Sequence, residues 1–96
     1  MYTKFYKISC DPANTDGLMA HYDAEVADKI RQSPAHVGHQ MVETGAGNWL
    51  LISNYVSKQA AEDFAPKVKE IVAPMVANFG MEISVLAEGE AVKQVS

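Results

Sequence analysis

The spacing of apolar residues changes along this 96-residue chain between a two-residue and a roughly four-residue repeat, and the order of these repeats most constrains the fold. Strict alternation is typical of a half-buried strand, whereas apolar residues three to four apart form one face of a helix. Alternation predicts strands at residues 2–10, 36–44, 49–56 and 81–88. The longer repeat predicts helices at residues 15–33 and 58–79. The elements therefore follow the order strand, helix, strand, strand, helix, strand.

Residues with special backbone preferences mark the helix ends. We expect Thr15 or Asp16 to cap the first helix and Ser57 to cap the second. Pro66 cannot donate a hydrogen bond to the carbonyl four residues earlier, so we expect a break there and a new helix beginning near Pro66. Gly80 suits the left-handed position that follows a helix.

This order of elements is the split βαβ pattern, and it predicts an α+β, ferredoxin-like βαββαβ fold. Right-handed crossovers place both helices on one face of a four-stranded antiparallel sheet. No linker, repeat or low-complexity segment divides residues 1–96, so we expect a single domain. Residues 89–96 are polar enough to form a loose tail, although Val92 and Val95 could dock on a partner.

Charge and composition exclude several partners. Eight basic residues against twelve acidic ones argue against a nucleic-acid partner. No apolar run approaches the roughly 20 residues of a membrane span, so we expect no membrane partner. The alternating N-terminus does not resemble a signal peptide, and the single cysteine cannot form an intramolecular disulfide. Both features predict a cytoplasmic protein, with Cys10 as a buried, inert thiol.

The strand at residues 49–56 is apolar on both of its faces. A sheet with helices on one side normally presents polar residues on the other. Here Leu50, Ile52 and Val56 point away from Trp49, Leu51 and Tyr55, and Phe5 joins them from the first strand. An open patch of this kind invites association. We therefore expect a homodimer whose interface contains Phe5, Leu50, Ile52 and Val56.

Residues 34–39 lead through a glycine-bearing turn to a strand that ends in Tyr55-Val56-Ser57, and an alanine-rich helix follows. In this pattern the sequence resembles the dimeric α+β barrel superfamily, and within it the antibiotic biosynthesis monooxygenase-like domains. In that family the strand usually ends in Trp rather than Tyr. The resemblance implies two protomers whose sheets form a barrel, each with a pocket for a small-molecule ligand between sheet and helices.

Aromatic and titratable side chains are the candidates for such a pocket. For binding an aromatic substrate the candidates are Tyr6, Tyr22, Trp49 and Phe64. For catalysis they are His39, His21 and Tyr55. The alternative is that the aromatic residues belong to the core and that the histidines are hydrogen-bonded or exposed to solvent.

His36 and His39 have a spacing that would suit a metal on a helix. On a strand, residues three apart point to opposite faces, so we expect no joint site and no metal. Haem-degrading members of the superfamily hold haem with a histidine on the second helix, and residues 58–79 contain none. We therefore expect no cofactor.

Taken with the resemblance, these residues suggest a small dimeric enzyme that oxidises an aromatic or polyketide-like molecule without a cofactor. A non-catalytic ligand-binding or stress-related dimer is the alternative. A third possibility is an interaction module whose sheet face is its only functional surface.

Overall fold

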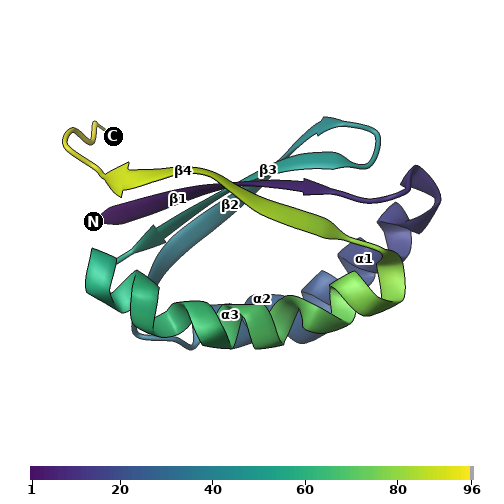
Figure 1. The fold of residues 1–96 in the computed structure, drawn as a ribbon, viewed down its shortest axis with the longest axis horizontal. Coiled ribbons are helices and arrows are strands. Elements are labelled where there is room, and N and C mark those ends of the chain that lie inside the picture. The colour runs from purple at the N-terminus through teal and green to yellow at the C-terminus, as the bar shows by residue number, and fades with distance from the viewer. Residues whose placement is uncertain (96) are drawn as a thin grey trace.

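A computed structural model describes residues 1–95, and the order of its elements is the one that the sequence predicts (Figure 1). The strands are β1 (Tyr2–Ser9), β2 (His36–Gly45), β3 (Asn48–Tyr55) and β4 (Glu82–Glu90). The helical elements are η1 (Pro12–Asn14), α1 (Thr15–His21), η2 (Tyr22–Val26), α2 (Ala27–Arg31) and α3 (Lys58–Phe79).

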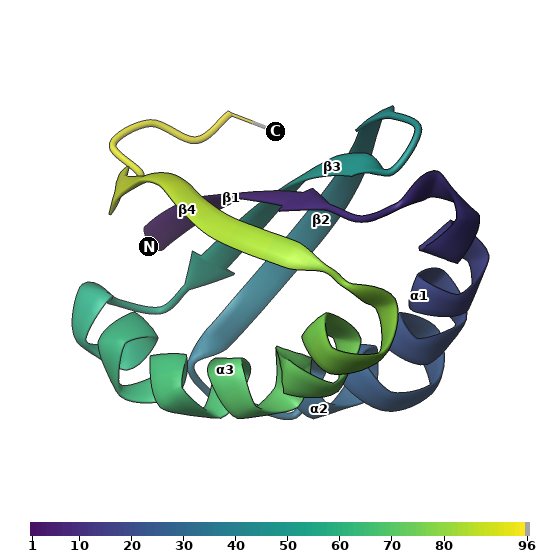
Figure 2. The same ribbon diagram turned by 45° about the vertical axis from the view of Figure 1, so that its right-hand side comes forward.

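The four strands form one antiparallel sheet in the order β2-β3-β1-β4. The helices α1, α2 and α3 all lie on one side of this sheet, as the turned view shows (Figure 2). The α+β, ferredoxin-like prediction is therefore confirmed. The two central strands, β1 and β3, present Ile8 and Trp49 side by side to the helices, where both are buried in the core.

The first helical segment contains a π-helical turn, η2, between α1 and α2. The backbone N–H of Ala27 bonds to the carbonyl of Tyr22, five residues earlier. Apolar residues recur every four positions in this segment. Because four residues of an α-helix turn about 40° more than one full turn, each apolar side chain would point about 40° away from the previous one. A wider π-helical turn takes up part of this drift. As a result Leu18, Tyr22, Val26 and Ile30 all remain on the side that faces the sheet.

The predicted break at Pro66 is wrong, because α3 runs without interruption from Lys58 to Phe79. Pro66 and Pro74 both lie inside the helix on its exposed side. Carbonyl groups that lose their partners there can bond to water instead. The opposite side carries the buried Ile71 and Met75, whose packing stabilises the helix across both prolines.

The ends of the elements follow the sequence with two exceptions. Ser57 caps α3 by accepting a hydrogen bond from the backbone of Ala60 at 3.0 Å, and Gly80 follows the helix in the left-handed conformation. Neither Thr15 nor Asp16 caps the first helix, however. Asp11 instead caps the short η1 turn that precedes it.

The second exception is the C-terminal tail, which begins later than residue 89. β4 extends to Glu90 and pairs with the start of β1, and the N–H of Ala91 bonds to the carbonyl of Met1 at 2.9 Å. Val92 and Val95 are almost fully exposed, and residue 96, the last of the predicted tail, lies outside the described residues.

The two faces of the sheet differ in what covers them. The helix-covered face holds the core, which continues through Leu18, Val26 and Met81. On the open face Phe5 pairs with Ile52, and Leu50 pairs with Val42. Except for the half-buried Ile52, these side chains are exposed, so the apolar open face predicted from the sequence is present.

Two further predictions concern single residues. Val56 is exposed but lies beyond the end of β3, beside Ala35 and Phe64, and so stands apart from the paired residues of the open face. Cys10 is half-buried rather than buried, and its thiol donates a hydrogen bond to the carbonyl of Asp11 at 3.3 Å. No helix within residues 1–95 is long and apolar enough to cross a membrane.

Candidate functional site

A cavity of about 50 Å³ lies between the sheet and the helices. Apolar side chains form most of its wall and come from every layer of the fold: Ile8, Leu18, Met19, Val26, Ile30, Met41, Leu51, Val68, Val72, Met75, Met81 and Ile83. Its volume holds a few water molecules, whereas pockets that enclose drug-sized ligands measure about 300–1,000 Å³. Four of the wall residues are methionines, whose unbranched side chains rearrange easily.

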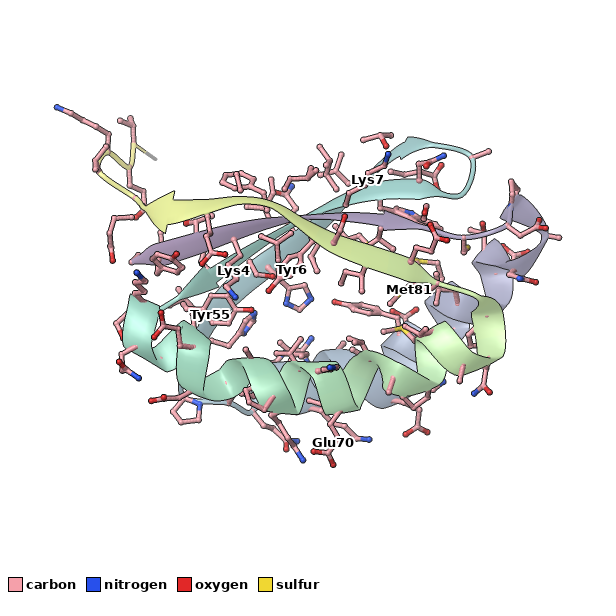
Figure 3. All side chains as sticks on the ribbon, viewed as in Figure 1. Lys4, Tyr6, Lys7, Tyr55, Glu70 and Met81 are labelled. Atoms are coloured by element: carbon pink, nitrogen blue, oxygen red, sulfur yellow. The ribbon has the colours of Figure 1, made fainter. Side chains whose placement is uncertain are left out.

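Five side chains give the cavity a polar part: Tyr6, Tyr22, His39, Ser53 and Tyr55. Tyr6 and Tyr55 point from the sheet toward α3, whereas Lys7 lies on the far side of the sheet and Glu70 on the outer side of α3 (Figure 3). Four of the five were candidates from the sequence.

A chain of hydrogen bonds runs from this polar part to the beginning of β2. The hydroxyl group of Tyr22 is hydrogen-bonded to Nε2 of His39. Nδ1 of His39 lies 2.9 Å from Nε2 of His36, and the centres of the two imidazole rings are 5.0 Å apart. Tyr22 comes from η2 and the two histidines come from β2, and Tyr22 and His39 lie 17 residues apart in the sequence.

The expectation that His36 and His39 point to opposite faces is wrong. The pairing of β2 with β3 shifts between His36 and Gly38, so that His36 pairs with Tyr55 while His39 pairs with Ser53. Such a β-bulge adds one residue to the strand and changes the alternation of side chains. Because Val37 is that extra residue, both histidines lie on the face that the helices cover.

Burial and neighbouring charge favour the neutral forms of these groups. Desolvation lowers the pKa of His39 below its ordinary value of 6.5, and His36 and Arg31 lower it further. Desolvation and Arg31 also lower the pKa of His36. Burial, followed by the charge of Asp23, raises the pKa of Tyr22. At neutral pH this places two neutral imidazoles beside a protonated phenol.

Tyr6, the other tyrosine of the cavity wall with a shifted pKa, is held in its protonated form as well. Burial raises the pKa of Tyr6, and a hydrogen bond with Tyr55 raises it further. The hydroxyl groups of Tyr6 and Tyr55 can donate hydrogen bonds to a ligand, whereas a neutral imidazole can accept a proton. The cavity thus combines hydrogen-bond donors with a base.

Three of the sequence candidates lie outside this cavity. Trp49 is 3% exposed and packs within the core. Phe64 packs beside the buried Tyr55 and Ala61 and lines a shallow groove on the outer surface. His21 lies against Phe79, with their ring centres 5.9 Å apart.

Sequence reasoning missed Ser53 and the partnership of His36 with His39. The alternation of β3 could have indicated Ser53, since it is two residues from Tyr55 on the same face. No signal in the sequence marks a bulge at Val37. Within residues 1–95, no group of three or more His, Cys, Asp or Glu side chains has an arrangement that could hold a metal ion.

No protein-family model and no curated protein matches this sequence. Solved structures do match it. A dimeric ferredoxin-like protein from an uncultured marine organism has a TM-score of 0.79 at 8% identity, covering 99% of this chain and 97% of its own. The haem degrader MhuD from Mycobacterium tuberculosis, with two haems bound in its active site, has a TM-score of 0.77 at 21% identity and full coverage of both chains.

SnoaB from Streptomyces nogalater, a cofactor-independent oxygenase, has a TM-score of 0.65 at 14% identity, covering 98% of this chain and 95% of its own. An antibiotic biosynthesis monooxygenase is also among the matches. At such low identities the likeness establishes a shared fold, and function has to be argued from the site. The comparison confirms that this chain has the fold of the antibiotic biosynthesis monooxygenase-like proteins.

Proposed function

We propose that this protein is a cofactor-independent oxygenase that binds an aromatic small molecule between its sheet and helices. The hydrogen-bonded pair of Tyr22 and His39 carries the proposal, because it places a neutral base at the wall of an otherwise apolar cavity. SnoaB, a protein of the same fold, is a cofactor-independent oxygenase, and this is in keeping with the proposal.

The chemistry begins with the removal of a proton. A substrate O–H or activated C–H group hydrogen-bonds to the oxygen of Tyr22, which takes the substrate proton as its own proton passes to Nε2 of His39. Tyr6 and Tyr55 donate hydrogen bonds to oxygen atoms of the resulting anion and stabilise its charge. The electron-rich anion then reacts with dioxygen directly. An activated CH₂ group becomes a carbonyl, with one oxygen atom retained and the other released as water.

An apolar cavity suits this reaction because it excludes water from the reactive anion. The present volume of about 50 Å³ does not accommodate an aromatic ring system. Substrate entry therefore requires wall residues to move aside, and Met19 and Met41, both half-buried, are the most adaptable of them.

Haem, which the structurally similar MhuD binds, does not fit this site. MhuD binds two haems, but α3 of this chain contains no histidine, and His39, the histidine in the cavity wall, is hydrogen-bonded to Tyr22 and His36. We therefore derive no step through haem.

We further propose that two copies of the chain associate through the open faces of their sheets. Phe5, Leu50 and Ile52 form an apolar surface there, as expected from the sequence. A relative with the same fold is a dimeric ferredoxin-like protein. Association would bury apolar surface and close the two sheets over each other.

Oxygen consumption tests the enzymatic proposal. The purified protein is mixed with a panel of hydroquinones and aromatic ketones that carry an activated CH₂ group, in an oxygen-electrode cell. We expect turnover of at least one compound and a loss of about 10²-fold or more in kcat for His39→Ala and Tyr22→Phe. Tyr2→Phe is the matched control, because the hydroxyl group of Tyr2 bonds to Glu88, away from the cavity.

The main alternative is a protein that binds such molecules without converting them. The largely apolar cavity, enlarged by the same movements of its wall, would serve that role equally well. Saturable binding of the same compounds with no oxygen uptake would support this alternative and would rule out the oxygenase.

A further inference from the structure

The hydrogen-bonded chain does not end at His39. We propose that His36 is a positioning residue that fixes the proton arrangement of His39 and carries the substrate proton from the cavity to solvent. This inference rests on the proposed function, because it explains how the base would be used. His36 does not line the cavity, and it acts through His39.

The geometry of β2 brings the two imidazoles together. The bulge at Val37 turns His36 onto the same face as His39, with 2.9 Å between the bonded nitrogen atoms. The ring of Tyr55 meets the ring of His36 edge-on at 6.4 Å between centres. His36 is half-buried at the first position of β2, after the turn that contains Pro34, so part of its side chain is open to solvent.

The hydrogen bonds allow one self-consistent arrangement in which the base is ready. Tyr22 donates its hydroxyl proton to Nε2 of His39, so His39 must carry its own proton on Nδ1. That Nδ1–H then donates to Nε2 of His36, which leaves the proton of His36 on its Nδ1. Without an acceptor at His36, only the bond from Tyr22 would favour the proton of His39 on Nδ1, and the Tyr22 oxygen can equally accept a bond from a protonated Nε2.

Transfer along this chain moves one proton and leaves no charge on the protein. The substrate proton bonds to the oxygen of Tyr22, and the Tyr22 proton moves to Nε2 of His39. The Nδ1 proton of His39 moves to Nε2 of His36, and the Nδ1 proton of His36 leaves to water. The electron pair of the broken bond stays on the substrate, which becomes an anion. The reverse sequence returns a proton to the cavity.

A relay of this kind removes an electrostatic difficulty. If His39 alone took the proton, a half-buried imidazolium would form beside Arg31 and His36, both of which disfavour positive charge there. Tyr22 from η2 and Tyr55 from β3 also lie against the pair, and neither supplies a carboxylate. Passing the proton on to His36 and water avoids a stable buried charge.

The protonation state of His39 can be measured by NMR on protein containing ¹⁵N-labelled histidine, without any substrate. In the wild type above pH 7 we expect His39 to carry its proton on Nδ1. His36→Gln should keep this tautomer, because an amide oxygen can accept the bond in place of Nε2. His36→Leu should lose it. His36→Asn is too short to reach His39 and should also lose it, which provides a second test if the Leu variant does not fold.

Hydrogen exchange separates positioning from proton transfer. An amide cannot pass a proton along the chain, so the Nδ1 proton of His39 should exchange with solvent at least about tenfold more slowly in His36→Gln than in the wild type. An unchanged tautomer in both His36→Leu and His36→Asn, or equal exchange in His36→Gln and wild type, would overturn the inference. These readouts need no turnover, so a negative oxygen-uptake result refutes the oxygenase and leaves the relay to be judged on NMR.

Discussion

Replacing Ile52 by glutamate should separate the two protomers of the proposed dimer. Ile52 lies in the middle of β3 on the open face of the sheet, directly beside Phe5 of β1. Phe5, Val42, Leu50 and Leu86 keep 37–56% of their surface exposed in the single chain. A carboxylate at position 52 would therefore stand at the centre of the surface that has to become buried.

The loss of dimer stability in Ile52→Glu comes mainly from the buried charge rather than from the lost apolar area. Burying the part of each apolar side chain that is exposed in the single chain stabilises the dimer by about 0.6–1.5 kcal/mol. Removing one such side chain therefore weakens the dimer only modestly. Burying an unpaired carboxylate costs several kcal/mol, and a two-fold symmetric interface contains two copies of it. A loss of about 4 kcal/mol raises the dissociation constant about 10³-fold.

Sedimentation velocity at micromolar concentration measures this directly. We expect the wild type to have a mass near twice that of the 10.5 kDa chain and Ile52→Glu to have the mass of one chain. Val76→Glu is the matched control, because Val76 is an exposed apolar residue on α3, away from the open face. A monomeric wild type, or a dimer that survives Ile52→Glu, would refute the reasoning.

Three other perturbations test the fold and its electrostatics. Pro66→Ala should stabilise the protein by about 2 kcal/mol. Alanine is favoured over proline inside a helix by about 3 kcal/mol, but it also makes the unfolded chain more flexible, which stabilises the unfolded state by about 0.4–1 kcal/mol. An unchanged Tm would contradict this expectation. Gly47→Ala should destabilise it by at least about 1–2 kcal/mol in urea titrations, since Gly47 has a φ of 73° and a Cβ there would collide with the carbonyl oxygen of Cys10. The free energy of unfolding should also fall as the pH drops below about 6.5, the value at which histidine protonates in the unfolded chain. In the folded protein the pKa values of His36 and His39 are lowered, so below this pH the unfolded state binds more protons than the folded state and is favoured. Urea titrations between pH 7.5 and pH 5 measure this fall, which the double variant His36→Gln/His39→Gln should reduce.

The order of strands and helices was readable from the sequence because each element has a clear apolar period. The same periods assigned Tyr6, Tyr55 and Tyr22 to the sides that face each other across the cavity. This succeeded because side-chain direction in a regular element depends only on position along the chain. The apolar open face, with Phe5 and Leu50, was readable for the same reason.

The errors lie where the backbone is irregular. The bulge at Val37 puts His36 beside His39, whereas regular alternation would have separated them. A bulge depends on pairing with β3 and leaves no mark in the local sequence. The wrongly predicted break at Pro66 also reflects contacts that are distant in the sequence, because packing of the buried side of α3 outweighs the local effect of the proline. Trp49 was a pocket candidate because it lies on the face of β3 that the helices cover. Its depth in the core could not be predicted, because it depends on how α1 and α3 pack.

The proposed mechanism requires His39 and Tyr22 to remove a proton from an aromatic molecule held between sheet and helices. Stopped-flow mixing without oxygen isolates this step, because the anion of an aromatic ketone or hydroquinone absorbs at longer wavelength than its neutral form. We expect the wild-type protein to produce the absorbance of the anion at a pH well below the pKa of the free compound, and His39→Ala to produce none. Equal anion formation by His39→Ala, or none by a wild-type protein that demonstrably binds the compound, would contradict the claim.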